Sequence, residues 1–263
     1  MVRNPETARG LIESVRVILC NLDGCLTRGR TLAPGAAELA ELAGARLWIV
    51  SNNSTHDQAE LSVELSVLGI AVAPERIALA GMHALDIVHS RWPRARVLML
   101  AAESLERRAR ALGLTPVADD CDVVLLARDP ELSFARLDTA VRAAARGRPV
   151  VIANPDTTHP REDGQPTIET GSLAAALRAA VPNAQCIVVG KPEASLFRAA
   201  LTGAGVRPDD AVMIGDTPAT DIAGAMAMGI AAILIGCDAA ALAPNLDALL
   251  NARGATIGHA VFN

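Results

Sequence analysis

The sequence predicts an α/β protein in which helices wrap a parallel β-sheet. Short runs rich in β-branched residues alternate with longer segments of helical periodicity, and the runs do not alternate with polar residues, as expected for strands buried on both faces. The 263 residues, 51% of them apolar, suffice for one large or two modest domains. The expected strands span 17–20, 47–50, 97–100, 123–126, 150–152, 187–189, 212–214 and 231–235.

Helices between these strands are expected from the residues at their ends. Ser54, with Asp57 three residues later, resembles a capping box, and Gly69 stands where that helix would end. Three further helices are expected to end at Gly113, Gly147 and Gly203, the last of them with Pro192 in its first turn. The segment 154–171 contains three prolines and two glycines, so it is either a loop and hairpin beside a site or a turn-rich connector.

Composition argues against several classes of partner. The net charge is -5 and the pI is about 5.6, so no overall field attracts nucleic acid. Aromatic residues make up 2% of the chain and tyrosine is absent, which removes the usual stacking platforms for bases. No uncharged run reaches the ~20 residues that cross a bilayer. We expect a soluble cytoplasmic protein that binds neither nucleic acid nor membrane.

The five cysteines are an odd number and show no CxxC or Cys/His spacing typical of metal ligands. We interpret them as small buried hydrophobic residues in a reducing cytoplasm.

Polar residues that follow four of the expected strands suggest a site. They are Asn21 and Asp23, the run Ser51 to Ser54, Lys191 after Gly190, and Asp216 with Asp221. Each alone has a common structural explanation, such as a turn, a helix cap or a solvated cation. Ligands of open parallel sheets bind at the carboxyl ends of the strands, and these residues would all emerge from one edge of one sheet. Together they are the groups that hold magnesium against a phosphoryl group.

The order and spacing of these residues resemble the haloacid dehalogenase (HAD) superfamily of phosphatases, in the branch with a large α/β C2-type cap that includes NagD and p-nitrophenyl phosphatase-like enzymes. The four motifs of the family correspond to Asn21 to Gly24, Ser51 to Ser54, Gly190 to Glu193, and Gly215, Asp216 with Thr220 to Ile222. The run Ala153 to Asp156 resembles the cap signature of this branch. The resemblance covers residues 15–236. It implies a Rossmann-like core over 1–78 and 182–263 and a cap over 79–181.

The resemblance also implies roles for individual residues. Position 21 would be the nucleophile that forms an aspartyl-phosphate, and Asp23 would be the acid and base. Mg²⁺ would be held by the Asn21 side chain, the Asp23 backbone carbonyl, Asp216 and waters, with Asp221 bonding those waters or orienting Lys191. The phosphoryl group would contact Asp23, Gly24, Ser51, Asn52, Asn53 and Lys191. The substrate, a small phosphorylated metabolite, would be selected in the cap by Asp156, Thr157 and His159. His56, His83, His89 and His259 receive no role. A homodimer is an expectation from relatives alone.

Asn21 departs from the family pattern, because the family carries aspartate at that position. A neutral carboxamide is too poor a nucleophile to form an acyl-phosphate, so we expect substrate to bind but hardly to turn over. The amide oxygen could still ligate the metal, more weakly than a carboxylate. An engineered replacement or a natural loss of hydrolysis would account for Asn21, and the agreement of the other motifs favours the first. The alternative function is a non-catalytic phosphometabolite-binding homologue. Chain length disfavours a receiver domain, and Asp216 with Asp221 disfavours a dehalogenase.

Overall fold

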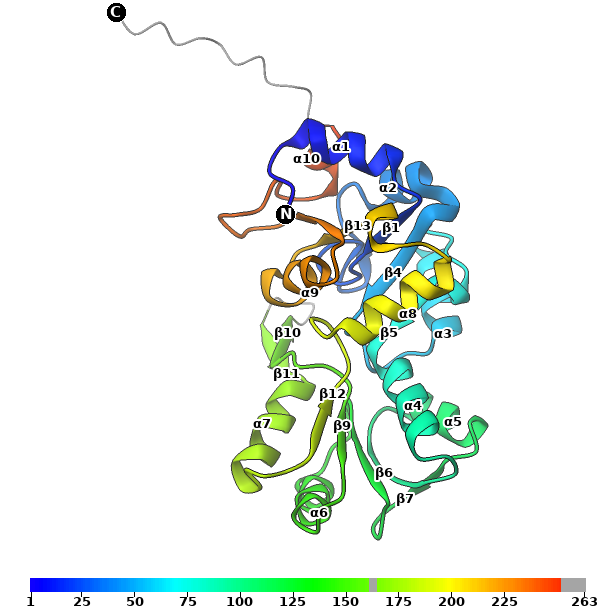
Figure 1. Cartoon of the computed structure of the whole chain (residues 1–263), viewed down its shortest axis with the longest axis vertical. Coiled ribbons are helices and arrows are strands. Elements are labelled where there is room, and N and C mark those ends of the chain that lie inside the picture. The colour runs from blue at the N-terminus through cyan, green and yellow to red at the C-terminus, as the bar shows by residue number, and fades with distance from the viewer. Residues whose placement is uncertain (161–164, 252–263) are drawn as a thin grey trace, which may run out of the picture.

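The computed structural model describes residues 1–160 and 165–251. Its main feature is a pair of five-stranded sheets, which lie one above the other in Figure 1. All strand pairs within each of these two sheets are parallel. The α/β class expected from the sequence is therefore confirmed. The end of the expected core range 182–263, and His259 within it, lie outside the described residues.

The first sheet, called the core sheet here, has the strand order β14-β13-β1-β4-β5. Its strands are β1 (Val17–Cys20), β4 (Leu47–Ser51), β5 (Ile77–Leu79), β13 (Ala211–Gly215) and β14 (Ala231–Leu234). Because β1 lies in the centre, every one of its residues is buried.

The second sheet has the strand order β12-β9-β8-β6-β7. Its strands are β6 (Arg96–Leu100), β7 (Thr115–Val117), β8 (Val123–Leu126), β9 (Val150–Ile152) and β12 (Cys186–Val188). The sequence places the strand at 187–189 in the core, but β12 pairs with β9 in the second sheet. The second sheet therefore extends beyond residue 181 before the chain returns to the core sheet.

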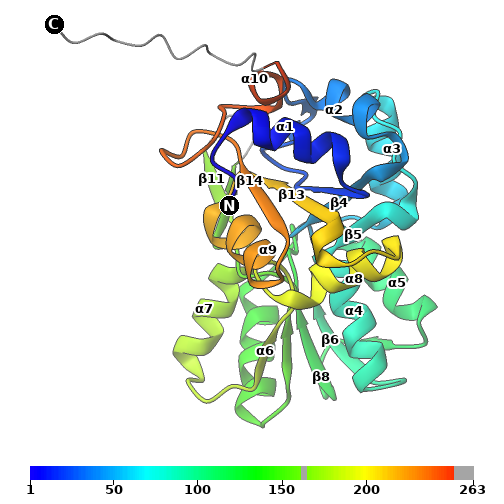
Figure 2. The same ribbon diagram turned by 45° about the horizontal axis from the view of Figure 1, so that its top comes forward.

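The helices cover both faces of each sheet (Figures 1 and 2). They are α1 (Pro5–Ser14), α2 (Ala36–Ala43), α3 (Gln58–Val67), α4 (Ala80–Arg91), α5 (Glu103–Ala111), α6 (Phe134–Ala145), α7 (Thr170–Ala180), α8 (Ala194–Ala204), α9 (Ala223–Ala227) and α10 (Leu246–Leu250). None of the helices in the described part of the chain is long and apolar enough to cross a membrane.

Alternate residues of each strand pack in different apolar clusters, as the pleat requires. Val97 and Met99 of β6 pack in a cluster that also contains Ile49 of the core sheet, whereas Leu98 and Leu100 pack with residues of α6 and α7. The first cluster is continuous from one sheet to the other. The two sheets are therefore joined by apolar packing as well as by the chain.

The irregular segment 154–171 contains a hairpin of β10 (Thr158–Pro160) and β11 (Pro166–Ile168), whose connecting residues lie outside the described part of the chain. A shorter hairpin, β2 (Thr27–Arg28) with β3 (Thr31–Leu32), follows the first motif. Of the two interpretations of 154–171, the loop and hairpin is confirmed. Two strands of the five-stranded sheets, β5 and β7, were not expected from the sequence. Each has three residues, and β7 contains Pro116, which an edge strand tolerates.

Three expected helix boundaries are wrong. The capping box of α3 is formed by Asp57 and Glu60, three residues later than the expected box at Ser54. Asp57 accepts from the Glu60 N–H at 2.8 Å, and Glu60 accepts from the Asp57 N–H at 2.9 Å. Ser54 instead accepts from the backbone N–H of Arg128, in the loop after β8. The helix expected to have Pro192 in its first turn begins only after the N-cap residue Glu193, so Pro192 precedes it. The same helix, expected to end at Gly203, runs to Ala204, with Gly205 at φ 63° as its cap.

Replacing the α3 cap tests this assignment. Asp57→Ala should lower the free energy of unfolding by about 1 kcal/mol, because the Glu60 N–H in the first turn loses its acceptor. Asp57→Asn should lower it by less, since asparagine is a cap of similar quality. Urea denaturation of the two variants measures the difference. Equal losses for both variants would show that the carboxylate charge, and not the cap, stabilises this end of the helix.

Candidate active site

The candidate site is built around Asn21, which directly follows β1. The strand carries this residue to the carboxyl edge of the core sheet, where ligands of such sheets bind. The Asn21 N–H donates to the carbonyl of Ile214 at 2.9 Å and so continues the pairing with β13. The Asn21 residue is 8% exposed. Its amide must therefore find partners within the protein.

Four partners surround the Asn21 amide. The oxygen Oδ1 accepts from Lys191 Nζ at 2.8 Å and from the Leu22 N–H at 2.9 Å. The nitrogen Nδ2 donates to the Asp23 carbonyl and to Asp216 Oδ1, both at 2.9 Å. Exchanging the amide oxygen and nitrogen would turn its hydrogens toward two donors and its oxygen toward two acceptors. The surroundings therefore select one orientation of this amide.

Lys191 is the most deeply buried cation of the site, with 1% of the residue exposed. Its ammonium donates to Asn21 Oδ1 and Val50 O at 2.8 Å each and to Asp221 Oδ1 at 2.6 Å. These three acceptors match the three hydrogens of an ammonium group. The charge is therefore buried with a full set of partners, one of them a carboxylate.

The route by which Lys191 reaches the site differs from the expectation. The expectation that all site residues leave one edge of one sheet is wrong, because Lys191 follows β12 of the second sheet. Asn52, at the end of β4, holds its backbone: Lys191 N donates to Asn52 Oδ1 at 2.7 Å, and Asn52 Nδ2 donates to Lys191 O at 3.1 Å. The carboxyl ends of the two sheets therefore face each other, and the site lies where they meet.

Asp221 is fully buried and connects Lys191 to the loop after β13. Its second oxygen, Oδ2, accepts from the N–H groups of Asp216 and Thr217 at 3.1 Å each. Gly215 makes this approach possible, since a Cβ atom there would lie 2.2 Å from Cβ of Asp221. The structure contains the contact between Asp221 and Lys191 that the expected orienting role of Asp221 requires. Whether it also binds metal-bound water stays a prediction.

Asp216 lies against the loop that follows β1. Gly24 is required there for two reasons: its φ is 86°, and a Cβ atom would lie 2.0 Å from Asp216 Oδ2. Cys25 donates a long S–H contact to Asp216 Oδ1 at 3.7 Å. Burial and the neighbouring Asp221 raise the pKa of Asp216 above its usual value, against the influence of Asn21 and Lys191.

Asp23 follows Asn21 by two residues and keeps its side chain exposed to solvent. The protein around it nevertheless desolvates the carboxylate and raises the pKa of Asp23, opposed by His159 and Lys191. The shift favours the protonated form of this group relative to an aspartate in water. The role of Asp23 as acid and base stays a prediction.

Ser51 ends β4, and Asn52 and Asn53 follow it. The side chains of all three residues have protein partners. Ser51 Oγ accepts from the Asn53 N–H at 3.1 Å. The Asn52 amide binds the Lys191 backbone and also donates to Asp156 at 3.0 Å. Asn53 Oδ1 accepts from the N–H groups of Thr55 and His56 and so closes its own turn. Phosphate binding by these residues stays a prediction.

The expected cap residues lie on or near the β10–β11 hairpin. Asp156 accepts from Asn52, and burial raises its pKa. Thr157 is exposed and uses its carbonyl to accept from the Glu169 N–H at 3.0 Å. His159 pairs through Nδ1 with Glu169 Oε2 at 3.1 Å. His159 also lowers the pKa of Asp23 through its charge, so hairpin and core loop influence each other.

Glu169 and Arg128 were missed by the sequence analysis. Glu169 is 8% exposed and contacts His159, Thr170 and Asn154, and Arg128 Nε lies 3.7 Å from it. Arg128 could have been found by the rule applied to the other strands, because it is the first polar residue after β8. Glu169 had no such signal, since it stands between a short strand and a helix.

The side chains as oriented do not fit a bound divalent cation. Two oxygens expected to bind it, the Asp23 carbonyl and Asp216 Oδ1, accept from Asn21 Nδ2, and the third expected ligand, Asn21 Oδ1, faces Lys191. A cation needs oxygen ligands, and Nδ2 offers only hydrogens. No group of three or more His, Cys, Asp or Glu side chains placed to hold a metal occurs among residues 1–160 and 165–251.

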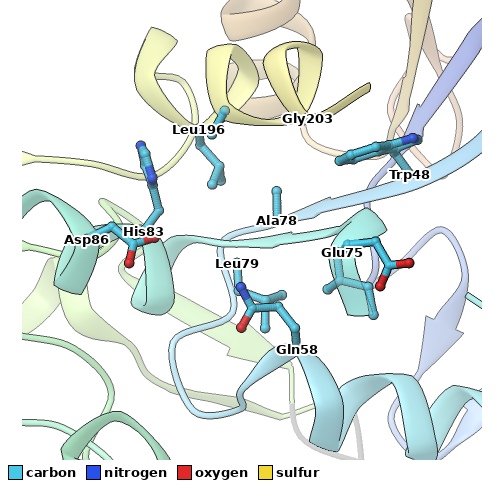
Figure 3. A pocket seen from close by; sticks show the side chains of 12 residues that line it. Trp48, Gln58, Glu75, Ala78, Leu79, His83, Asp86, Leu196 and Gly203 are labelled. Carbon is cyan, nitrogen blue, oxygen red and sulfur yellow. The ribbon is translucent and has the colours of Figure 1, made fainter. Parts of the chain in front are cut away.

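A separate pocket of about 130 Å³ contains none of the residues of this site (Figure 3). It lies between α8, β5 and the start of α4, and Trp48, His83 and Leu196 are among its lining residues. Burial lowers the pKa of His83. The volume is below the few hundred Å³ usual for a metabolite pocket.

Comparison with known proteins shows the family of this chain. The family described as haloacid dehalogenase-like hydrolase matches residues 18–115, and the HAD-hydrolase-like family matches residues 188–253. Chronophin of Mus musculus is 33% identical over 229 residues, which cover 81% of this chain and 78% of chronophin. The chain belongs to the HAD-like hydrolases. D-glycerol 3-phosphate phosphatase of Mycobacterium tuberculosis is 31% identical, covering 83% of this chain and 62% of that protein.

Solved structures of this HAD branch have the same fold. A glycerol phosphate phosphatase from Mycobacterium tuberculosis in complex with calcium superposes with a TM-score of 0.79 at 29% identity, covering 87% of this chain and 68% of that one. The same enzyme has also been solved with magnesium. A p-nitrophenyl phosphatase from Archaeoglobus fulgidus gives a TM-score of 0.77 at 28% identity, covering 84% and 86% of the two chains. The resemblance stated from the motifs is thereby confirmed.

The buried pair of Lys191 and Asp221 gives a testable prediction. Lys191→Met should lower the free energy of unfolding by about 3 kcal/mol or more, because it leaves Asp221 charged and unpaired in the interior. Adding Asp221→Asn to that variant should recover part of the loss, since the remaining amide carries no charge. Urea denaturation of both variants and the parent checks the order. A double variant less stable than Lys191→Met would contradict the charge argument.

Proposed function

We propose that this chain carries the site of a phosphomonoester hydrolase for a small phosphorylated metabolite, with hydrolysis held very low by Asn21. The observation that carries the proposal is the meeting of Asn21, Lys191, Asp216 and Asp221 at the carboxyl edge of the core sheet. The relatives that are named phosphatases support the reaction class.

Lys191 and Asp23 would carry the chemistry that this chain retains. Lys191 supplies a buried positive charge beside position 21, which would stabilise the charge on a phosphoryl group. Asp23, with its raised pKa, would protonate the leaving oxygen and then activate water. Ser51, buried at the end of β4, would contact a phosphoryl oxygen. The missing step is attack on phosphorus, because an amide is not a nucleophile of useful strength.

The cap, which begins near residue 79 and includes β12, would select the substrate through Asp156, Thr157 and His159. The support is their position: the hairpin that carries His159 is near enough to Asp23 for their charges to interact. The low aromatic content favours a small aliphatic phosphate over a flat ring. A homodimer remains an expectation.

A non-catalytic phosphometabolite-binding homologue is the second candidate function. The observation that favours it is the complete set of four hydrogen-bond partners around the Asn21 amide. A site adapted to aspartate would not need to offer two acceptors to an amide nitrogen at this position. The two candidates share the fold and the binding site, and they differ in whether the remaining residues can still perform the reaction.

Restoring the carboxylate distinguishes these candidates. For the enzyme, Asn21→Asp should raise hydrolysis of p-nitrophenyl phosphate in the presence of MgCl₂ by roughly 10⁴-fold to 10⁶-fold, the range lost when a covalent nucleophile is removed. The control is Asn21→Asp combined with Asp23→Asn, which keeps the nucleophile and lacks the acid. If Asn21→Asp folds and gives no rise above the parent, the binder is supported and the enzyme is not.

His159 gives a second prediction in the Asn21→Asp background. His159→Ala should raise KM for the best phosphorylated metabolite by about tenfold, which corresponds to the loss of one contact of about 1.4 kcal/mol. The rate of p-nitrophenyl phosphate hydrolysis should stay within about threefold, because that substrate would not use the contact. Steady-state kinetics on both substrates separates the effects. An equal loss on both would place His159 in the chemistry common to all substrates.

A further inference from the structure

The orientation of the Asn21 amide has a consequence for metal binding by this chain. Lys191 Nζ and the Leu22 N–H both donate to Oδ1, which turns Nδ2 toward the Asp23 carbonyl and Asp216 Oδ1. These two oxygens are the ones that the family resemblance assigns to the cation. Nδ2 therefore lies between the oxygens where a cation would be expected to bind.

Asn21 is thus more than a neutral ligand of reduced strength. A weak ligand would offer an oxygen to the cation and lose only charge. The Asn21 amide instead donates two hydrogen bonds to the oxygen atoms a cation requires, and its own oxygen is occupied by two other donors. A cation could bind there only if the amide gave up all four of its hydrogen-bond partners. If the amide oxygen and nitrogen changed places, the hydrogens on Nδ2 would point at the Lys191 ammonium and the Leu22 N–H, which are themselves donors.

We propose that the Asn21 side chain replaces the divalent cation at this site, so that this chain excludes Mg²⁺ rather than binding it weakly. The hydrogen bond from Nδ2 to Asp216 Oδ1 takes over part of the neutralisation of Asp216, which lies beside the buried Asp221. This inference differs from the expectation that the Asn21 oxygen ligates the metal. It rests on the proposed function only through the position of the cation, which the family resemblance gives.

Removing the side chain separates replacement from weak ligation. If Asn21 is a weak ligand, Asn21→Ala should bind a divalent cation less tightly than the parent. If Asn21 replaces the cation, Asn21→Ala should bind it more tightly, because the Asp23 carbonyl and Asp216 become free. The expected order of affinity is Asn21→Asp, then Asn21→Ala, then the parent. We expect the parent to be at least about a hundredfold weaker than Asn21→Asp, as for loss of a metal-site contact.

The measurement is binding of Mn²⁺, a cation that also prefers oxygen ligands, followed by electron paramagnetic resonance of the free ion with no substrate present. Asn21→Asp combined with Asp216→Asn is the control, and its binding should fall back toward the parent. Thermal unfolding gives a second readout: millimolar MgCl₂ should raise the Tm of Asn21→Asp and Asn21→Ala and leave the parent unchanged.

Three results would overturn the inference. The first is a parent that binds Mn²⁺ as tightly as Asn21→Ala or more tightly. The second is the absence of Mn²⁺ binding by all three chains when each is folded, because Asn21 would then not be what excludes the ion. The third is undiminished binding by the Asp216→Asn control, which would place the ion elsewhere. Absence of hydrolysis by Asn21→Asp would count against the proposed enzyme and leave this inference standing.

Discussion

The site depends on one buried ammonium group. Lys191 carries a charge into a region with almost no solvent, and such a charge is tolerated only with a complete set of hydrogen-bond acceptors. Those acceptors come from three separate parts of the core: Asn21 after β1, Val50 within β4 and Asp221 beyond β13. Lys191, which follows β12 of the second sheet, therefore fixes the relative position of three segments of the core sheet. The loops at the junction are ordered around this charge.

The same contact limits how the two sheets can move. The chain passes between them at two places, at the start of α4 and after β12, and each place is tied to the loop that follows β4. Gly81 N–H donates to Asn53 O at 3.1 Å, and Lys191 exchanges two hydrogen bonds with Asn52. The apolar cluster that contains Ile49 and Val97 crosses the junction as well. Separating the sheets would break these contacts together, so the contacts oppose separation of the sheets at the site.

The fold class and the cluster of Asn21, Lys191, Asp216 and Asp221 could be predicted from the sequence, whereas the geometry of the cluster could not. Buried strands such as β1 and β8 are visible as apolar runs because burial on both faces leaves no place for polar residues. The short strands β5 and β7 carry too little of that signal. The polar residues after the strands could be named because parallel strands end at a common edge. That Lys191 arrives from the second sheet depends on the pairing of β12 with β9, which no local pattern specifies.

The Asn21 amide shows why the remaining details require a structure. Asparagine and aspartate have nearly the same shape, so a sequence pattern treats the exchange as the loss of one charge. In the folded chain the exchange also changes an acceptor into a donor at the atom facing Asp216, while the atom facing Lys191 stays an acceptor. The two ends of the amide are thereby matched to partners of opposite kinds. The partners Asp216 and Lys191 come from segments distant from Asn21 in sequence. Their placement makes Asn21 compatible with a closely packed site that holds the carboxylates of Asp216 and Asp221 and the ammonium of Lys191.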